Sequence, residues 1–531
     1  MNSDRHTHLR ALVILGGIVF IFLLVRGPVA WRQSGGQDEE WYAVPGLMVA
    51  EEGVPRVPYA RASQEGSVFL GAERMLFAMP PAAFYAQAPF FLVLPATYGT
   101  ARMASLLAGC IAIVTVFGFG REWFADDRVG LWGAGIYSLT RLLFFPATFA
   151  RPDMLCGMFG LLAMWGVARW TNVRSLRWVV LAGVCLGLAG LSHPFAIVFA
   201  MQLFPWVLIT GRGIKERIVV LIALSVTTAI TFSLWLPMIF AAPDLFRLQF
   251  LNNILAPAGP GLLARLLMPW DSFSHHLPML IDRTHPVQFV MLLGGWLVFG
   301  KMIWRSRRMG AATPMLSDAD LSETRCSSGL TCWLLAGSSV YLLIACQGEH
   351  PIQGYWCYSA GLLCLCLAAV VVRTVDTLSS QHDMTKAQST FRRGLLTGVA
   401  LLLIVLAMLP GSGVRTILAY VQHAGDPNYQ NAAFVESILE DLPVDAQLTV
   451  GIEFALDAYG IRSATGRPDD VILGIRHPLY FDSTRIPTNY AILGRLALAE
   501  QLDEAMNGEL VSIYGDHDDE FSCYAEVYRI R

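Results

Sequence analysis

The sequence predicts an α-helical polytopic membrane protein with about eleven spans and a small α/β domain near its C-terminal end. Apolar residues make up 55% of the 531 residues and charged residues only 15%, whereas a soluble globular chain carries about 25% charged residues. Mean hydropathy is +0.50, and nearly uncharged runs of membrane-spanning length recur along the chain. This composition excludes a water-soluble enzyme and a disordered chain.

Eleven apolar runs are interpreted as membrane spans. The first resembles a secretory signal, but no convincing cleavage site follows it, so we interpret it as an uncleaved anchor. The stretch 75–99 contains four prolines, which favours broken interfacial helices over a further straight span. The predicted spans are 10–26, 102–119, 129–148, 154–169, 177–192, 194–210, 218–241, 286–303, 329–346, 355–372 and 394–411.

Lys and Arg residues are distributed unevenly between the two sets of loops. With the N-terminus inside, the inner segments hold 19 Lys or Arg residues, and the short outer loops near 151, 193 and 350 hold one, Arg151. The positive-inside rule therefore predicts a cytoplasmic N-terminus and places 27–101, 242–285 and 412–531 outside. We expect an integral protein of the plasma (inner) membrane.

The predicted domains are a transmembrane domain, 1–411, and a soluble extracytoplasmic α/β domain, 412–531. Residues 413–531 hold 8 Arg, no Lys and 19 Asp or Glu. Apolar periodicity predicts helices at 431–441 and 496–506 and strands at 447–453, 490–493, 510–514 and 523–530. No basic face indicates a nucleic-acid partner, and the ten cysteines form no disulfide or zinc pattern.

Three consecutive carboxylates follow the first span: Asp38, Glu39 and Glu40. An amphipathic segment, 41–50, comes next. On spacing alone, the acidic residues are either a solvated cluster at the membrane surface or a general base held partly desolvated at the bilayer edge, where a carboxylate can accept a proton from a hydroxyl. We expect Glu40 to be the most solvated of the three.

A second carboxylate, Asp153, lies in a very short outer turn after Arg151 and Pro152. It is either the N-cap of the next helix or part of a site, and the two roles are compatible. Under the predicted topology Asp38 and Asp153 face the same side. We therefore expect their carboxylates within roughly 10 Å of each other, around one cavity.

Other outer turns carry residues with two interpretations. His193 is either a structural residue bonded to the backbone or a ligand of phosphate or substrate. His350 and Tyr355 flank a turn where aromatic residues usually form an interfacial belt. Arg265 lies in the outer loop 242–285. No P-loop, HExxH or GxSxG motif is present.

Four short motifs occur in a characteristic order. They are Asp-Glu-x-x-Tyr-Ala at 38–43, Pro-Pro-x-x-x-Tyr at 80–85, Ala-Arg-x-x-Ser-x-x-Ala-Gly at 101–109 and Ala-Arg-x-Asp at 150–153. In this order they resemble glycosyltransferase family 39 and its bacterial relatives, the protein O-mannosyltransferases and aminoarabinose transferases, which have a GT-C fold. The similarity is good over 1–210 and weaker to about 411.

The resemblance implies a hexosyl- or pentosyltransferase that moves a sugar from a polyprenyl-phosphate donor to a lipid, glycan or protein acceptor on the outer face. It implies an inverting single displacement with Asp38 as base, Glu39 beside it and Asp153 as the second acidic residue. The residues expected to bind substrate are Tyr42, Tyr85, Arg102, Arg151, His193, Arg265, His350 and Tyr355. We expect no cofactor, and nothing in the sequence supports a divalent-metal site.

The chain departs from the family at two positions. Relatives often carry Glu-Lys before the Pro-Pro pair, where this chain has Ala78 and Met79, and often carry Lys in place of His193. The alternatives to a sugar transferase of this type are an oligosaccharide ligase, a transporter or lipid flippase, and a scaffold protein. A transporter usually carries ionisable residues near the middle of its spans, whereas the candidate acidic residues here lie in outer loops.

Overall fold

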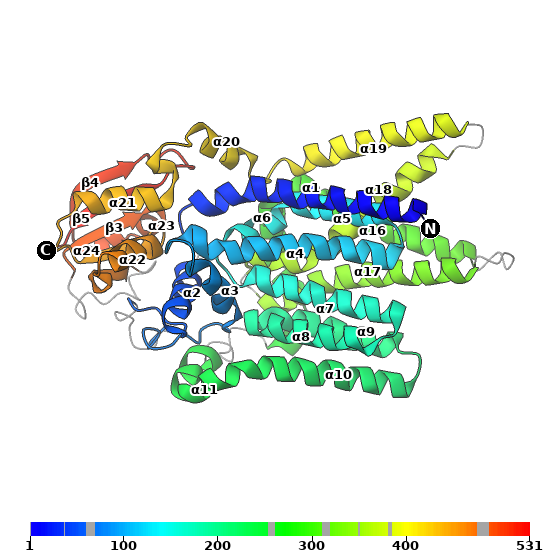
Figure 1. The fold of residues 1–531 in the computed structure, drawn as a ribbon, viewed down its shortest axis with the longest axis horizontal. Coiled ribbons are helices and arrows are strands. Elements are labelled where there is room, and N and C mark those ends of the chain that lie inside the picture. Colours follow the sequence, from blue (N-terminus) through cyan, green and yellow to red (C-terminus); the bar gives the residue numbers. More distant parts are fainter. Residues whose placement is uncertain are drawn as a thin grey trace.

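Long helices lie side by side in one bundle, and a small sheet domain covers one end of it in the computed structural model (Figure 1). The structure describes residues 2–36, 38–59, 69–252, 261–310, 319–348, 351–380, 385–474 and 488–530. Within these residues, eight helices are long and apolar enough to cross a membrane, and two shorter apolar helices accompany them.

Each predicted span falls on a helix or on consecutive helices. The span expected at 129–148 is not continuous, because the chain breaks at Thr140, whose hydroxyl accepts a hydrogen bond from Leu142 N and caps the second half. The helices are α1 (Asn2–Arg32), α4 (Tyr98–Phe124), α5 (Asp127–Leu139), α6 (Arg141–Thr148), α7 (Asp153–Val173), α8 (Leu176–Ser192), α9 (Ile197–Thr210), α10 (Ile214–Phe232), α11 (Leu236–Ala241), α16 (Pro286–Gly310), α17 (Ala319–Gln347), α18 (Cys357–Ser379) and α19 (Lys386–Met408). Shorter helices, α12 (Pro243–Phe246), α14 (Leu262–Leu267), α15 (Trp270–Thr284) and α20 (Val414–Gln422), lie between spans or lead to the sheet domain.

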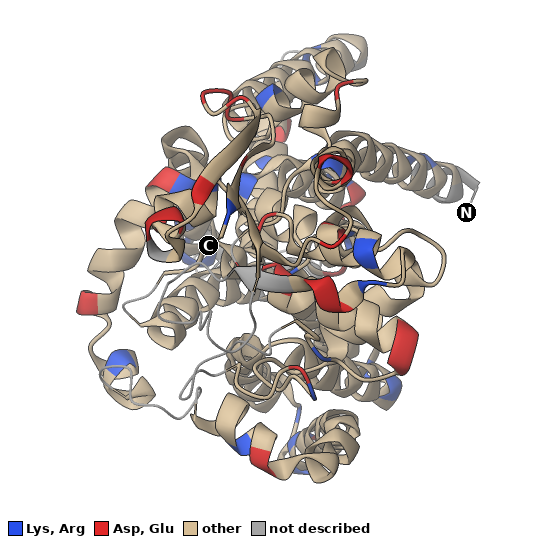
Figure 2. Cartoon of the chain, turned by 90° about the vertical axis from the view of Figure 1, so that its left-hand side faces the viewer, with Lys and Arg blue, Asp and Glu red and all other residues tan. Residues whose placement is uncertain are grey.

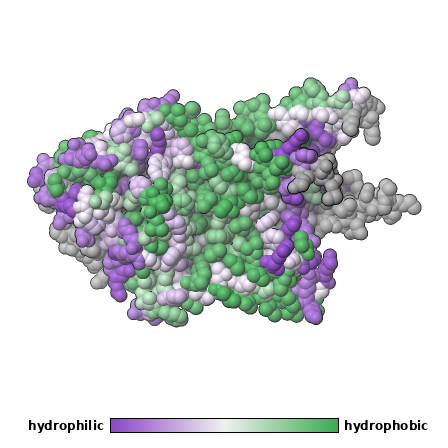
Figure 3. Space-filling model, viewed as in Figure 1, coloured by the Kyte–Doolittle hydropathy of each residue, from purple (hydrophilic) through white to green (hydrophobic). Residues whose placement is uncertain are grey.

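On the face shown in Figure 3, an apolar belt crosses the middle of the bundle, with hydrophilic residues toward both ends. Large apolar side chains such as Val13, Ile222 and Leu403 are exposed on α1, α10 and α19. A soluble protein rarely leaves so much contiguous apolar surface in water, and lipid is the medium that such a belt requires. The prediction of an integral membrane protein is therefore confirmed.

The N-terminus lies at the end of the bundle away from the sheet domain (Figure 1). Helices α2 (Glu40–Glu52) and α3 (Ala82–Phe91) of the first outer loop lie at the same end as the sheet domain. The first outer loop and the C-terminal domain therefore lie at the same end of the bundle, opposite the N-terminus. The positive-inside rule predicts the same arrangement for 27–101 and 412–531.

The absolute orientation is predicted to leave the sheet domain outside the cell. Asp518→Cys, at a fully exposed side chain, should react in intact cells with a membrane-impermeant maleimide. Gly213→Cys lies in the turn before α10, and a Cβ there meets nothing within 4 Å; it should react only after the cells are permeabilised. Labelling of both positions in intact cells would contradict the predicted topology.

Helix α2 does not have the one buried and one exposed face that is expected of an amphipathic segment at 41–50. Residues 40–49 are buried on every face, because α3, α4 and α22 (Ala455–Ala464) pack against them. The mostly apolar composition of this segment therefore reflects burial between the bundle and the sheet domain.

The C-terminal domain holds a five-stranded mixed sheet, with strand order β2-β1-β3-β5-β4. Strand β1 pairs in parallel with β2 and β3, and β5 pairs antiparallel with β3 and β4. The strands are β1 (Leu448–Gly451), β2 (Val471–Gly474), β3 (Tyr490–Gly494), β4 (Glu509–Gly515) and β5 (Tyr524–Arg529), and helices α21 (Asn431–Asp441), α22, α23 (Arg495–Ala499) and α24 (Leu502–Met506) complete the domain. Figure 2 views the molecule onto this end, and residues 413–531 hold 19 Asp or Glu and 8 Arg.

The four predicted strands and the helix at 431–441 are present, but β2 and α22 were not predicted. The helix expected at 496–506 is divided in two, because Gln501 adopts a left-handed conformation with φ of 59°. The domain shares one hydrophobic core with the first outer loop: Trp41 and Leu47 of α2 belong to the same buried cluster as Phe454 and Leu456.

Candidate active site

Asp38 lies in a tight turn between α1 and α2 and has φ of 64°. Asp is one of the few residues other than glycine that tolerate this left-handed conformation. The backbone bonds Glu39 N to Gly36 O (3.0 Å) and Trp41 N to Asp38 O (3.0 Å) close the turn on both sides. The Asp38 carboxylate is 55% exposed, so it is open to a substrate while its backbone is held.

Arg151 brings Asp38 and Asp153 together. Its Nη1 lies 3.7 Å from Asp38 Oδ2, and its Nε donates a hydrogen bond of 3.0 Å to Asp153 Oδ2. Asp153 is the first residue of α7 and is fully buried. Since one guanidinium contacts both carboxylates, the two acidic residues form a single polar centre at the end of the bundle that carries the sheet domain.

Aromatic residues and one glycine enclose this centre. The Arg151 guanidinium lies 5.3 Å from the centre of the Tyr42 ring. A Cβ at Gly354 would overlap the Asp153 carboxylate, so only glycine allows this approach. Next to it, Tyr355 is buried with its ring 4.8 Å from that of His193.

His193 is a buried, neutral residue. Its Nδ1 accepts a hydrogen bond from Phe195 N (3.1 Å), which caps the short helix that follows. Burial lowers the pKa of His193 to about 4, although the nearby Asp153 opposes the shift. At neutral pH this side chain is therefore uncharged.

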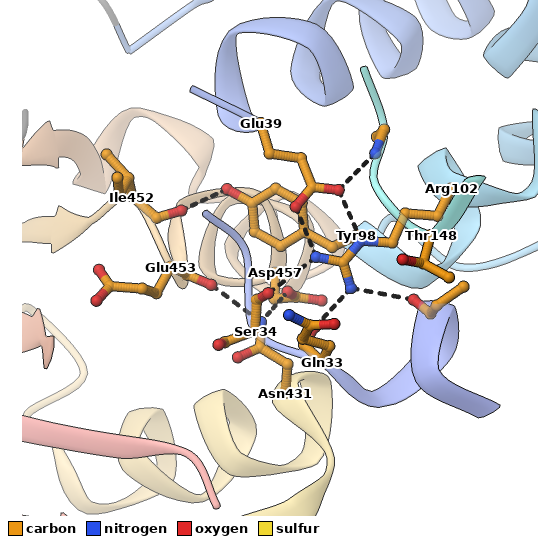
Figure 4. A network of polar contacts seen from close by, with 12 residues as sticks. Gln33, Ser34, Glu39, Tyr98, Arg102, Thr148, Asn431, Ile452, Glu453 and Asp457 are labelled. Atoms are coloured by element: carbon orange, nitrogen blue, oxygen red, sulfur yellow. Dashed lines mark hydrogen bonds and ion pairs between the residues drawn. The ribbon is translucent and has the colours of Figure 1, made fainter. Parts of the chain in front are cut away.

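Glu39 and Arg102 form an ion pair with each other and do not contact the Asp38 carboxylate among the described contacts. Both are fully buried, and Glu39 accepts two hydrogen bonds of 2.6 Å from the Arg102 guanidinium and one from Ala150 N. Arg102 also donates to the carbonyls of Ala30, Gln33 and Ser34 (Figure 4). Both side chains are enclosed and paired with each other, and this geometry ties the first loop to α4.

Glu40 is not the solvated member of the cluster that we expected. It is 1% exposed because α2 is enclosed. Burial, together with the negative charge of Asp38, raises the pKa of Glu40 well above its ordinary value. This burial could not be predicted from the sequence, since three adjacent acidic residues usually indicate a solvated surface.

Three other predicted residues lie apart from the centre or outside the described structure. The Tyr85 hydroxyl donates to Gly53 O at 3.1 Å. Arg265, on α14, lies beside Gly348 at the end of α17. His350 lies outside the described residues.

Two carboxylates of the sheet domain, Glu453 and Asp457, lie close to the first outer loop and were not predicted (Figure 4). Both are buried. Burial raises the pKa of each to about 7, although Asp457 also accepts a 2.6 Å hydrogen bond from Asn431 and is near Arg102. No spacing pattern in the sequence relates them to residues 33–39.

We predict that Asp457 makes the protein more stable at acidic than at basic pH. Its folded pKa of about 7 lies above the ordinary value of 3.8, so the folded state holds the proton more tightly. The stabilisation is complete below about pH 4 and decreases as the pH rises to about 7. Asp457→Asn should therefore raise stability at pH 8, by on the order of 4 kcal/mol, and leave it little changed at pH 4. Thermal unfolding in detergent at both values checks this, and equal effects at both would contradict it.

A cavity of about 280 Å³ lies between the first outer loop and the sheet domain. Ser34, Gly35 and Gly36 line it from the loop, and Glu453 and Arg495 from the domain. Asp38 and Asp153 do not line this cavity, so it is not the shared cavity that we expected around those two carboxylates. Among the described residues, no group of three or more His, Cys, Asp or Glu side chains could hold a metal ion.

The fold resembles that of solved membrane enzymes over nearly the whole chain. ArnT from Cupriavidus metallidurans, solved bound to undecaprenyl phosphate, has 14% identity and a TM-score of 0.54, with 97% of each chain covered. The archaeal oligosaccharyltransferase AglB from Archaeoglobus fulgidus, solved with an inhibitory peptide and a dolichol-phosphate, has 13% identity and a TM-score of 0.50, with 98% of this chain and 74% of AglB covered. The chain thus has the GT-C fold of membrane glycosyltransferases.

Residues 78–236 match the model of a family described as dolichyl-phosphate-mannose-protein mannosyltransferase. The predicted resemblance to this group of glycosyltransferases is confirmed. No curated protein gives a significant match.

Proposed function

We propose that this protein transfers a sugar from a polyprenyl-phosphate donor to an acceptor hydroxyl or amine on the extracytoplasmic side of the membrane. The observation that carries the proposal is the Asp38–Arg151–Asp153 centre. It lies at one end of a bundle whose fold matches that of ArnT. An exposed carboxylate next to a buried, paired one is an arrangement in which the two acidic groups can take different roles.

The exposed carboxylate, Asp38, acts as the base. It accepts the acceptor's proton while the acceptor heteroatom forms a bond to the anomeric carbon of the sugar. The bond from that carbon to the phosphate oxygen breaks, its electron pair goes to the phosphate, and polyprenyl phosphate leaves. Attack from the face opposite the phosphate inverts the anomeric configuration.

Asp153 orients Arg151, and Arg151 supplies positive charge where the phosphate becomes more negative as it leaves. Tyr42 and Tyr355 enclose this centre, and the neutral His193 ring packs against Tyr355. We assign Glu39 and Arg102 the role of positioning residues.

Purified protein supplied with short-chain polyprenyl-phosphate sugars and membrane extract tests the proposal. We expect free polyprenyl phosphate and a glycosylated product in equal amounts by mass spectrometry. We also propose that no metal ion is required, so a chelator should leave this rate unchanged. Donors that stay intact but cross the bilayer of a proteoliposome would indicate a lipid transporter instead.

A further inference from the structure

The turn that follows β1 in the sheet domain contacts the loop that leads to Asp38. Gly35 N donates a hydrogen bond of 2.9 Å to the carbonyl of Glu453. The Tyr98 hydroxyl, on the first turn of α4, donates one of 2.6 Å to the neighbouring carbonyl of Ile452. Two consecutive domain carbonyls therefore hold two segments of the membrane domain (Figure 4).

The same loop is fixed from its other side by Arg102. This guanidinium donates to the carbonyls of Gln33 and Ser34 and to the carboxylate of Glu39. Gly35 and Asp38 therefore lie between two fixed residues, Ser34 and Glu39. Among the described hydrogen bonds of Gly35, the partner is the Glu453 carbonyl of the sheet domain. Among the contacts between described residues, the Asp38 side chain is located by its 3.7 Å contact with Arg151.

The junction leaves no room for a side chain at Gly35. A Cβ there would lie 2.6 Å from the Tyr98 ring and 3.1 Å from Glu453 O. Tyr98 is 1% exposed. Asn431 also donates to Glu453 O at 3.1 Å, and this bond fixes the direction of the carbonyl.

We propose that the Ile452 and Glu453 carbonyls are positioning groups for Asp38, so that the sheet domain is a working part of the transfer site. The inference rests on the proposed role of Asp38 as base. A base must reach within about 3 Å of the proton that it removes, and a 1 Å displacement can lower a rate by about 10²-fold. When the domain turn releases Gly35, the loop gains freedom and Asp38 leaves the Arg151 centre.

Two variants of the full-length protein test the inference. Tyr98→Phe removes one hydroxyl, and Gly35→Ala pushes against the Tyr98 ring. Each should lower kcat for transfer by about 10- to 100-fold with the donor KM within about twofold, because the donor contacts remain. Amide hydrogen exchange in the peptide that contains Gly35 should become faster in both variants.

The matched controls remove a tyrosine hydroxyl or add a methyl group to a glycine away from the junction. Tyr514→Phe loses a hydroxyl bonded to Asp441 in the same domain, and Gly27→Ala adds a methyl group that meets nothing within 4 Å. Both should leave kcat and the exchange rate at Gly35 unchanged.

The outcomes separate this inference from the proposed function. Faster exchange with unchanged kcat would show that the junction does not position Asp38 and would overturn the inference, and so would unchanged exchange in both test variants. If the wild-type protein releases no polyprenyl phosphate with any donor, the proposed function itself fails, and the role assigned to the two carbonyls fails with it.

Discussion

Asp38→Asn is expected to lower the rate of sugar transfer by about 10² to 10⁴, which is the usual contribution of a general base. Asparagine keeps the size of the side chain and tolerates the left-handed conformation of residue 38, so the turn should survive. Donor binding should also survive, because the substitution removes only basicity. Transfer and donor affinity measured on the same purified preparation check this expectation.

The neighbouring carboxylates provide the comparison. Glu39→Gln breaks a fully buried ion pair with Arg102 and should cost about 3–5 kcal/mol of stability, with activity lost through unfolding. Asp518→Asn changes a carboxylate that is 98% exposed and should change neither property. Near-normal transfer by Asp38→Asn would show that a group other than Asp38 takes the proton from the acceptor.

Asp153→Asn is expected to have the second-largest effect. The substitution leaves the buried Arg151 guanidinium with a weaker partner on α7. Breaking a buried pair by removing one charge costs about 3–5 kcal/mol. Arg151 should then turn toward Asp38 and neutralise it, so transfer should fall about 10- to 100-fold in the protein that remains folded.

A double variant separates the two effects. Arg151→Met combined with Asp153→Asn removes both charges, and replacing a whole buried pair is much less costly than breaking it. Stability should largely return, as measured by thermal unfolding, while transfer stays low. Recovery of transfer in the double variant would show that the pair is structural only.

The helical spans could be predicted because hydropathy is a local property of the chain. Asp38 and Asp153 could also be named as a pair, because short motifs and the positive-inside rule placed both on one side of the membrane. The break at Thr140 was missed, since the apolar run continues through it and the capping bond depends on a single hydroxyl.

The burial of the first loop could not be predicted from local patterns. Glu39 and Glu40 are enclosed by α4 and by the sheet domain, which comes about 400 residues later in the chain. The same long-range packing hides the roles of Gly354 and of the carbonyls at 452 and 453. A sequence does not show which backbone carbonyls accept long-range hydrogen bonds. It also does not show which glycine lies so close to another side chain that no larger residue would fit.

The anomeric configuration of the first-formed product tests most directly whether Asp38 acts as a base in a single displacement. Donor and product can be followed by proton NMR, with water as the acceptor when no natural acceptor is supplied, before the released sugar mutarotates. Direct attack on the anomeric carbon predicts a product of inverted configuration. Retained configuration would mean that an enzyme group first attacks the sugar to form a covalent intermediate, and it would contradict the single displacement in which Asp38 acts as the base.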